Sequence, residues 1–227
     1  MDELDVTVDQ FDRHLDVLSQ HRVVSLDGAL DALAAGDHGP HVVVTFDDGF
    51  ADVHAHAFPR LADRGLPFTL YVATAYLGRE MRWEGSSARP APALSWRQLR
   101  ELAASPLCTL GNHTHTHARP DRLTTDELDR CTVTLQDRLG VTPRHFAYPW
   151  GVAVPRLEDE LRRRFRSAVT GQVGRNVPRT DPMRLRRVPV RQTDPIEFFA
   201  AKLRGRLLPE RTYARVVTVA KGLGVHA

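Results

Sequence analysis

The stretch VVVTFDDG, residues 42–49, decides the fold of this 227-residue chain. Its β-branched residues and its phenylalanine predict a buried β-strand, and the glycine predicts a turn where that strand ends. Successive side chains of a strand point in opposite directions, so Asp47 and Asp48 cannot both do the same job. One carboxylate could hold a metal ion while the other faces a reacting group. The alternative is a solvated Asp-Asp-Gly turn.

Strands and helices alternate along the rest of the chain. Capping boxes predict helices that begin after Thr7, Ser95 and Thr124. Further strands are expected at 23–25, 68–72, 108–111, 145–148, 167–170 and 185–190, helices at 27–35, 52–64, 155–165 and 195–208, and a long loop at 76–94. The alternation predicts a parallel α/β sheet or barrel. We expect one domain over 1–227, with the motifs within 42–151 and a flexible tail at 209–227.

Composition and charge narrow the possible partners and the compartment. No apolar run approaches the ~20 residues of a membrane span, and the acidic start, residues 1–5, lacks a signal-peptide pattern. Cys108 and Cys131 form no CxxC pair, which predicts reduced thiols and a cytoplasmic protein, with one disulfide as the alternative. The net charge is +3, and the late arginine-rich runs, 162–164 and 184–191, predict a solvated face and no nucleic acid. An anionic substrate or peripheral membrane contact is the alternative.

Three unusual clusters follow predicted strands: Asp47-Asp48, the histidines of residues 113–117, and residues 148–151. Sites in α/β proteins collect beyond the carboxyl ends of strands. A helical turn would put His113 and His117 on one face, where both could bind one metal ion, and would point His115 elsewhere. Two histidines and one carboxylate leave coordination positions open for water and substrate. The second carboxylate could then act as a general base.

Together these motifs resemble the polysaccharide deacetylases, also called the NodB-homology domain or carbohydrate esterase family 4. TFDDG at 45–49 looks like the family's first motif, and HTHTH at 113–117 looks like its second, of the form H-(S/T)-x-x-H. FAYPWG at 146–151 is similar to the F-A-Y-P-Y-G version of the third, and LSWRQL at 94–99 resembles the segment that precedes the histidine motif. The resemblance covers roughly residues 8–190. It implies a distorted, incomplete (β/α) barrel.

The resemblance also implies a role for each matching residue. Asp47 would be the general base that activates water. The implied metal ligands are Asp48, His113 and His117. The backbone N–H of Trp150, where the family usually has Tyr, would help hold the oxyanion. Tyr148 and Pro149 would shape the acetyl pocket, with structural packing as the alternative for Tyr148. The implied cofactor is one divalent metal ion, with zinc as the default and cobalt, nickel or iron as alternatives.

The sequence departs from the family pattern at the general acid. Members with the F-A-Y-P-Y-G motif usually carry a strand that ends in Tyr-His ahead of the helix that here starts at Val8. That histidine is thought to protonate the leaving amine, and no match precedes Val8 in this sequence. The family's other arrangement, a Leu-x-His near the C-terminus, finds no match, and His226 lies in the expected tail. We therefore expect a sheet that lacks one N-terminal strand, and a general acid that is unassigned.

Three functional hypotheses follow. The first is a metal-dependent hydrolase that removes N-acetyl groups from an amino-sugar-containing glycan or glycoconjugate, with Trp83 or Trp96 stacking on sugar rings unless Trp96 belongs to the core. The second is a non-catalytic or impaired sugar-binding relative that lacks the general acid. The third is a non-haem iron oxygenase, because two histidines and a carboxylate also suit iron. Turnover of an acetylated sugar would separate the first two, and dependence on oxygen would identify the third. The oligomeric state is left open.

Overall fold

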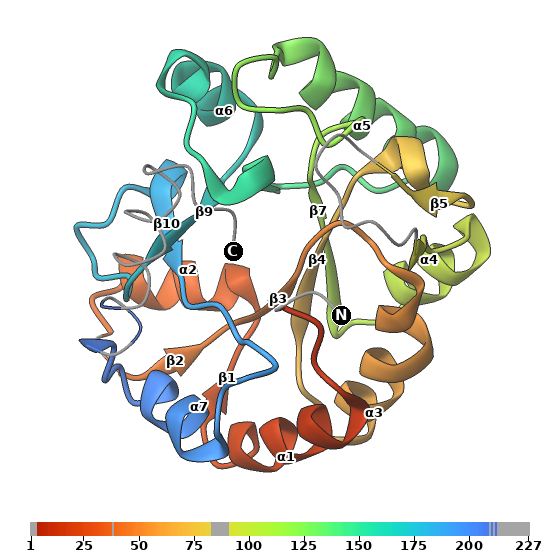
Figure 1. Ribbon diagram of the computed structural model, residues 1–227. Helices are drawn as coiled ribbons and strands as arrows, with labels where there is room; N and C mark the ends of the chain where they lie inside the picture. Colours follow the sequence, from red (N-terminus) through yellow and green to blue (C-terminus); the bar gives the residue numbers. More distant parts are fainter. Residues whose placement is uncertain (1–3, 38, 83–90, 209, 211, 213–227) are drawn as a thin grey trace.

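A curled parallel sheet forms the centre of the protein. The computed structural model describes residues 4–37, 39–82, 91–208, 210 and 212. The sheet has six strands in the order β10-β9-β8-β7-β4-β3. Their bounds are β3 Val44–Phe46, β4 Phe68–Val72, β7 Cys108–Asn112, β8 His145–Ala147, β9 Ser167–Val173 and β10 Leu185–Arg187. Helices surround the curled sheet (Figure 1). The architecture is therefore the expected incomplete (β/α) barrel.

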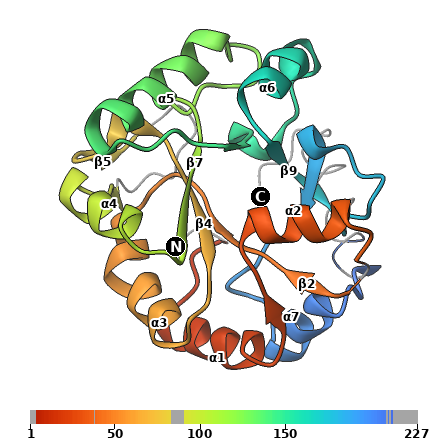
Figure 2. The ribbon, with the colours of Figure 1, turned by 180° about the vertical axis from the view of Figure 1, so that it is seen from behind.

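Most helices begin near their predicted starts, but the helix expected at 52–64 opens with a π-helical segment, Val53–Ala57, and becomes α-helical only at Phe58. The outer helices are α1 Val8–Leu18, α3 Phe58–Asp63, α4 Trp96–Ala103, α5 Thr125–Leu139, α6 Glu158–Arg164 and α7 Ile196–Leu203. Thr7 and Ser95 both form complete capping boxes, as predicted. Helix α2, Leu26–Ala34, lies across the end of the barrel where the strands begin (Figure 2). The opposite end, where the strands finish, is thus left for the polar clusters.

Several element boundaries differ from the sequence-based expectation. The strand expected at 42–46 is split into β2, His41–Val42, which pairs with β1, Arg22–Val23, and the central strand β3. The loop expected at 76–94 contains a short antiparallel pair, β5 Glu80–Met81 and β6 Ala91–Pro92. Helix α7 ends at Leu203 because the chain turns at Gly205, whose φ is 74°. The expected tail begins too early, since Glu210 is fully buried; most of 209–227 lies outside the described residues.

Strand β4 shows how the sheet divides two apolar regions. Phe68, Leu70 and Val72 point outward into the large core under the helices. Tyr71 points the other way, into the barrel, where it packs with Leu26 and side chains of β8, β9 and β10. This alternation buries both faces of the strand, as expected for parallel sheets. The filled interior forms a floor beneath the ends of the strands.

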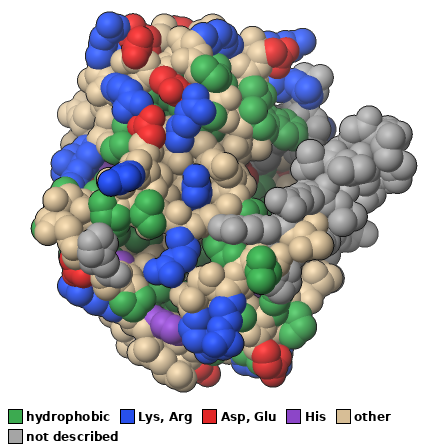
Figure 3. Space-filling model, turned by 90° about the vertical axis from the view of Figure 1, so that its left-hand side faces the viewer, with side chains coloured by type: hydrophobic (Ala, Val, Ile, Leu, Met, Phe, Trp, Pro, Cys, Tyr) green, Lys and Arg blue, Asp and Glu red, His purple; other side chains and the backbone are tan. Residues whose placement is uncertain are grey.

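The arginine-rich segments form ion pairs on the surface. Arg162 pairs with Asp181 at 2.5 Å, and Arg164 pairs with Asp129 at 2.7 Å. Figure 3 shows Lys and Arg side chains spread over one face of the molecule, not gathered into one patch. This arrangement fits the solvated face expected from the sequence. No helix among the described residues is both long and apolar enough to cross a membrane.

We predict that Gly111→Ala destabilises the protein by about 1–3 kcal/mol, the usual cost of overpacking a core. A Cβ at Gly111 would lie 2.6 Å from Cε1 of Tyr71, whose ring is fully buried. Urea unfolding would measure the change. The same substitution in a Tyr71→Leu background should cost less, because the ring that causes the clash is gone. Equal losses in both backgrounds would contradict this explanation.

Candidate metal centre and active site

Three side chains meet where β3 and β7 end. Oδ1 of Asp48 lies 3.2 Å from Nε2 of His113 and 3.5 Å from Nε2 of His117. All three donor atoms lie within 4.8 Å of one another. Two ligands bound 2.0–2.1 Å from a tetrahedral zinc ion are about 3.3–3.4 Å apart. The buried Asp48 Oδ1 accepts no hydrogen bond. The spacing and this unsatisfied oxygen fit a shared metal ion.

A tight turn after β3 separates the two carboxylates. Asp48 adopts a left-handed conformation with φ 70°, which Asp tolerates better than most residues, and Gly49 follows with φ 97°. Two backbone hydrogen bonds hold the turn: Ala73 N–H donates to Asp48 O, and Leu94 N–H donates to Gly49 O. The turn points Asp48 at the histidines, while Asp47 continues the alternation of β3 into the barrel.

The histidine segment is a loop, and the predicted helical turn is wrong. Thr114 and His117 have positive φ values of 69° and 53°, which no α-helix allows. The side chain of Asn112 accepts a hydrogen bond from Thr114 N–H at 2.8 Å and donates to Leu128 O at 2.8 Å. These local bonds compete with helix formation and fix the loop against α5. The loop brings the two rings together, with centroids 5.0 Å apart, by a different route from the expected one.

Glu127, in the first turn of α5, holds the same loop. Its carboxylate accepts from Thr116 N–H at 2.7 Å and from the Thr116 hydroxyl at 3.0 Å, and its carbonyl accepts from His115 N–H. The sequence placed Glu127 in a capping box with Thr124, but the Thr124 side chain makes no capping hydrogen bond. Glu127 is thus a positioning residue for the metal site. The only sequence signal was an acidic residue shortly after the histidines.

Hydrogen bonds and charges set the protonation of the histidines. The imidazole of His113 donates from Nδ1 to Ala147 O at 2.8 Å, which leaves Nε2 for a metal. Burial opposes charge on His113, but the adjacent carboxylate of Asp48 and the charge of Asp47 raise its pKa overall. Burial and the neighbouring His113 lower the pKa of His117 to about 4. The carboxylates therefore favour one positive charge at this point, which a metal ion would supply.

Asp47 is held by an arginine that the sequence analysis did not identify. Arg187, the last residue of β10, donates to both carboxylate oxygens, at 2.7 and 2.8 Å, and its Nε donates to Thr170 O. Burial alone would raise the pKa of Asp47, but Arg187 lowers it to about 2. Asp47 is thus ionised at neutral pH and oriented beside the metal site. A clue was available in the alternation of β10, which turns Arg187 inward and Arg186 outward.

The third motif forms a turn beside the histidine loop. Trp150 adopts a left-handed conformation there, with φ 64°. Its ring lies 5.5 Å from the ring of His117 and beneath the Arg119 guanidinium. A Cβ at the next residue, Gly151, would lie 2.8 Å from the backbone of Gly171, so only glycine fits there.

None of the other described candidates from the sequence belongs to the metal cluster. Tyr148 is fully buried and packs edge-to-face on Phe146, in the cluster between the sheet and the helices. This position fits the packing role that was the alternative for Tyr148. Pro149 is also buried. Trp96 packs against the large core. His145 lies at the start of β8, the opposite end of the barrel, and bonds Ser167 at 2.8 Å. Trp83 and His226 lie outside the described residues.

His115 also takes no part in the metal cluster. Its Nδ1 lies 2.9 Å from the hydroxyl of Thr74, and its backbone N–H bonds Glu127. This agrees with the expectation that it points away from His113 and His117.

We predict that Arg187→Gln lowers the free energy of unfolding near pH 7 by about 1–3 kcal/mol, less than for a fully enclosed pair because both side chains are partly exposed. In the parent protein the low pKa of Asp47 stabilises the fold above about pH 4, and this contribution is lost as the pH falls towards 2. In the variant, burial without Arg187 raises the pKa of Asp47. The deficit should therefore shrink as the pH falls.

Urea unfolding at several pH values would measure this difference. Arg186→Gln is the matched control, because that exposed side chain points away from the site. A deficit of the same size in both variants, or one that does not depend on pH, would contradict the role given to Arg187.

Comparisons with known proteins agree with this geometry. A family model described as Polysaccharide deacetylase matches residues 34–164. The structure of IcaB from Ammonifex degensii is 34% identical, with a TM-score of 0.77, over 89% of this chain and 91% of that chain. The Streptococcus pyogenes deacetylase PplD, solved in complex with acetate, is 21% identical, with a TM-score of 0.73, over 89% of each chain. At this lower identity the similarity shows the fold alone. A comparison with the curated proteins gives no match.

The family model covers more than half of the 227 residues, and the similarity to IcaB extends over nearly the whole chain. The matched region includes the Asp47-Asp48 turn, the histidine loop and the Trp150 turn. This chain belongs to the polysaccharide deacetylase family.

Proposed function

We propose that this protein is a metal-dependent N-deacetylase that acts on amino sugars of a glycan or glycoconjugate. The proposal rests on one observation: the two adjacent carboxylates have different environments. Asp48 converges with His113 and His117, while Asp47 is kept ionised by Arg187. One carboxylate is thus available as a metal ligand and the other as a base. Family membership supports deacetylation and argues against the oxygenase hypothesis.

The donor set suits one divalent metal ion. Two imidazole nitrogens and one carboxylate oxygen are typical of zinc sites with an open coordination position, and cobalt, nickel and iron accept the same donors. The residues that would hold the ion are Asp48, His113 and His117. A divalent ion bound there would supply Lewis acidity to the acetyl carbonyl and to the attacking water.

The residues of the chain would divide the remaining work. Asp47 takes a proton from the attacking water, and Arg187 holds its carboxylate in one orientation. The Trp150 N–H donates a hydrogen bond to the oxyanion that develops as the acetyl carbon becomes tetrahedral. Pro149 borders the same turn and would help to shape the acetyl pocket. The departing nitrogen also needs a proton, and no residue in the described part of the chain is assigned that role.

We predict that His113→Ala and His117→Ala each lose bound metal, because each removes one of three ligands. His115→Ala is the matched control and should keep the metal content of the parent protein, because its ring bonds Thr74 instead. Elemental analysis of the purified variants would measure metal per chain. If the two ligand variants retained metal at the parental stoichiometry, the site would be wrongly assigned.

We predict that Asp47→Asn keeps the metal and lowers deacetylation by at least about 10², the usual scale for a general base. The amide keeps the shape of the carboxylate but cannot accept the proton. Acetate released from N-acetylglucosamine oligomers would measure activity, and elemental analysis would show whether the site is still loaded. Loss of metal in this variant would mean that the roles of Asp47 and Asp48 are reversed. Absence of turnover in the loaded parent protein would instead favour the non-catalytic sugar-binding alternative.

A further inference from the structure

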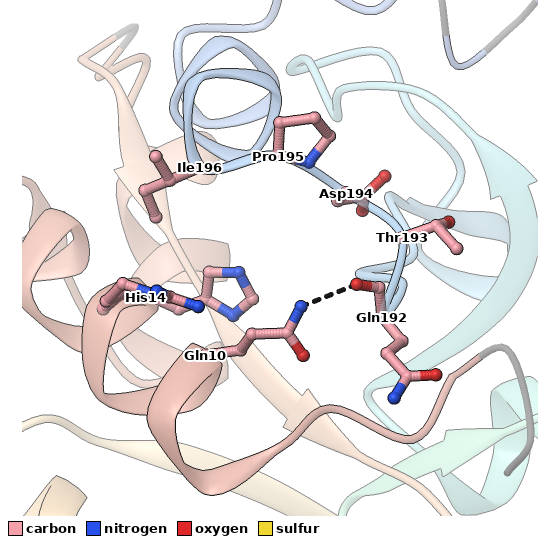
Figure 4. A pocket seen from close by; sticks show the side chains of 8 residues that line it. Gln10, His14, Gln192, Thr193, Asp194, Pro195 and Ile196 are labelled. Atoms are coloured by element: carbon pink, nitrogen blue, oxygen red, sulfur yellow. Dashed lines mark hydrogen bonds between the residues drawn. The ribbon is translucent and has the colours of Figure 1, made fainter.

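A second cavity lies apart from the metal centre, between α1 and the segment that leads into α7. Its volume is about 360 Å³, within the usual range for small-molecule sites. Gln10, Arg13 and His14 of α1 form one wall, and residues 192–196 form the other (Figure 4). None of the residues assigned to the metal centre lines it. The cavity therefore needs an explanation of its own.

His14 is the unusual residue of this cavity. Its side chain is 4% exposed, and its ring stacks on Phe199 at a centroid distance of 4.1 Å. Figure 4 shows the ring directed into the cavity, with no hydrogen bond between it and the other residues that line the cavity. The ring therefore presents its nitrogens to a molecule that enters the cavity.

The wall opposite His14 is rigid. Asp194 accepts hydrogen bonds from Lys202 Nζ at 2.6 Å and from Arg191 N–H at 2.8 Å. Lys202 is 2.8 Å from the buried carboxylate of Glu210. Gln10 joins the two walls, because its Nε2 donates to Gln192 O at 2.6 Å. A cavity held in this way loses little entropy when a ligand binds.

The charges and hydrogen-bonding groups around the cavity favour a neutral ligand. Arg13 would repel a cation, and the charge of Asp194 is already paired with Lys202. Burial lowers the pKa of His14, so its neutral ring offers one donor and one acceptor. A hydroxyl group is also both donor and acceptor, whereas an anion only accepts. Pro195 and Ile196 add an apolar surface suited to the C–H face of a sugar ring.

We propose that this cavity is a second carbohydrate site, which binds one sugar residue of the glycan at a distance from the metal centre. That the sugar belongs to the substrate rests on the proposed function; that the cavity accepts a sugar does not. A chain held at two points meets the metal centre at a raised effective concentration, without any new contact at the acetyl group.

The test is a titration with N-acetylglucosamine, followed through the ring C–H signals of His14 by NMR. His14→Phe, which keeps the stack on Phe199 and removes both nitrogens, identifies those signals. We expect a saturable shift in the parent protein. Thr193→Trp, at the exposed edge of the cavity, should raise Kd by about ten-fold or more, as the loss of ~1.4 kcal/mol of binding requires. Thr142→Trp, an exposed residue between α5 and β8, is the matched control and should leave Kd unchanged.

Three results would overturn the proposal: no shift of the His14 signals at high sugar concentration, the same Kd in the Thr193→Trp variant, or equal affinity for glycerol. The last would mean that any small polyol enters the cavity. Acetate release without a His14 shift would refute this site and leave the proposed function standing. A His14 shift in a metal-loaded protein that releases no acetate would refute the proposed function and leave this site standing.

Discussion

The ion pair between Asp47 and Arg187 joins the two edges of an open sheet. Asp47 follows β3 and Arg187 ends β10, and these are the outermost strands in the order of the sheet. No backbone ladder connects β3 with β10, so this pair is a direct link across the gap on the side of the strand ends. The same contact sets the charge of Asp47. One interaction therefore contributes to closing the barrel and also prepares the base.

The chemistry of the site follows from a division between neighbours in the chain. Asp47 and Asp48 are adjacent, yet one meets a guanidinium and the other meets two imidazoles. The alternation of the strand starts the division, and the left-handed conformation of Asp48 completes it. Two carboxylates on the same side would repel each other and share one proton. Opposite directions give the two carboxylates different partners, which the proposed roles of base and ligand require.

The sequence predicts most of the fold because the start signals and the strand pattern are local. The capping boxes at Thr7 and Ser95 and the apolar run before Asp47 are examples, although β3 is half-buried and not the buried strand expected. The boundaries of elements are harder to predict, because they depend on a few residues. The split of the expected 42–46 strand into β2 and β3 is an example. The spacing of His113 and His117 correctly predicts that their side chains meet, but the helical turn expected between them is wrong. Bonds from Asn112 and Glu127, which depend on the packing of α5, shape that loop.

Arg187 could not be identified without the order of the strands. It is 140 residues from Asp47 in the chain, and its own segment reads as a basic surface. Only a curled sheet with β10 at one edge and β3 at the other puts the two side chains together. The same segment continues directly into residues 192–196, one wall of the second cavity. The geometry of the base and the shape of that cavity thus share one stretch of backbone, and Lys202 secures its far end through Asp194 and the carbonyl of Pro189. A change in the packing of α7 would therefore affect both places. The Asp48 turn and the histidine loop are held by Ala73, Leu94 and α5, so they would be affected less directly.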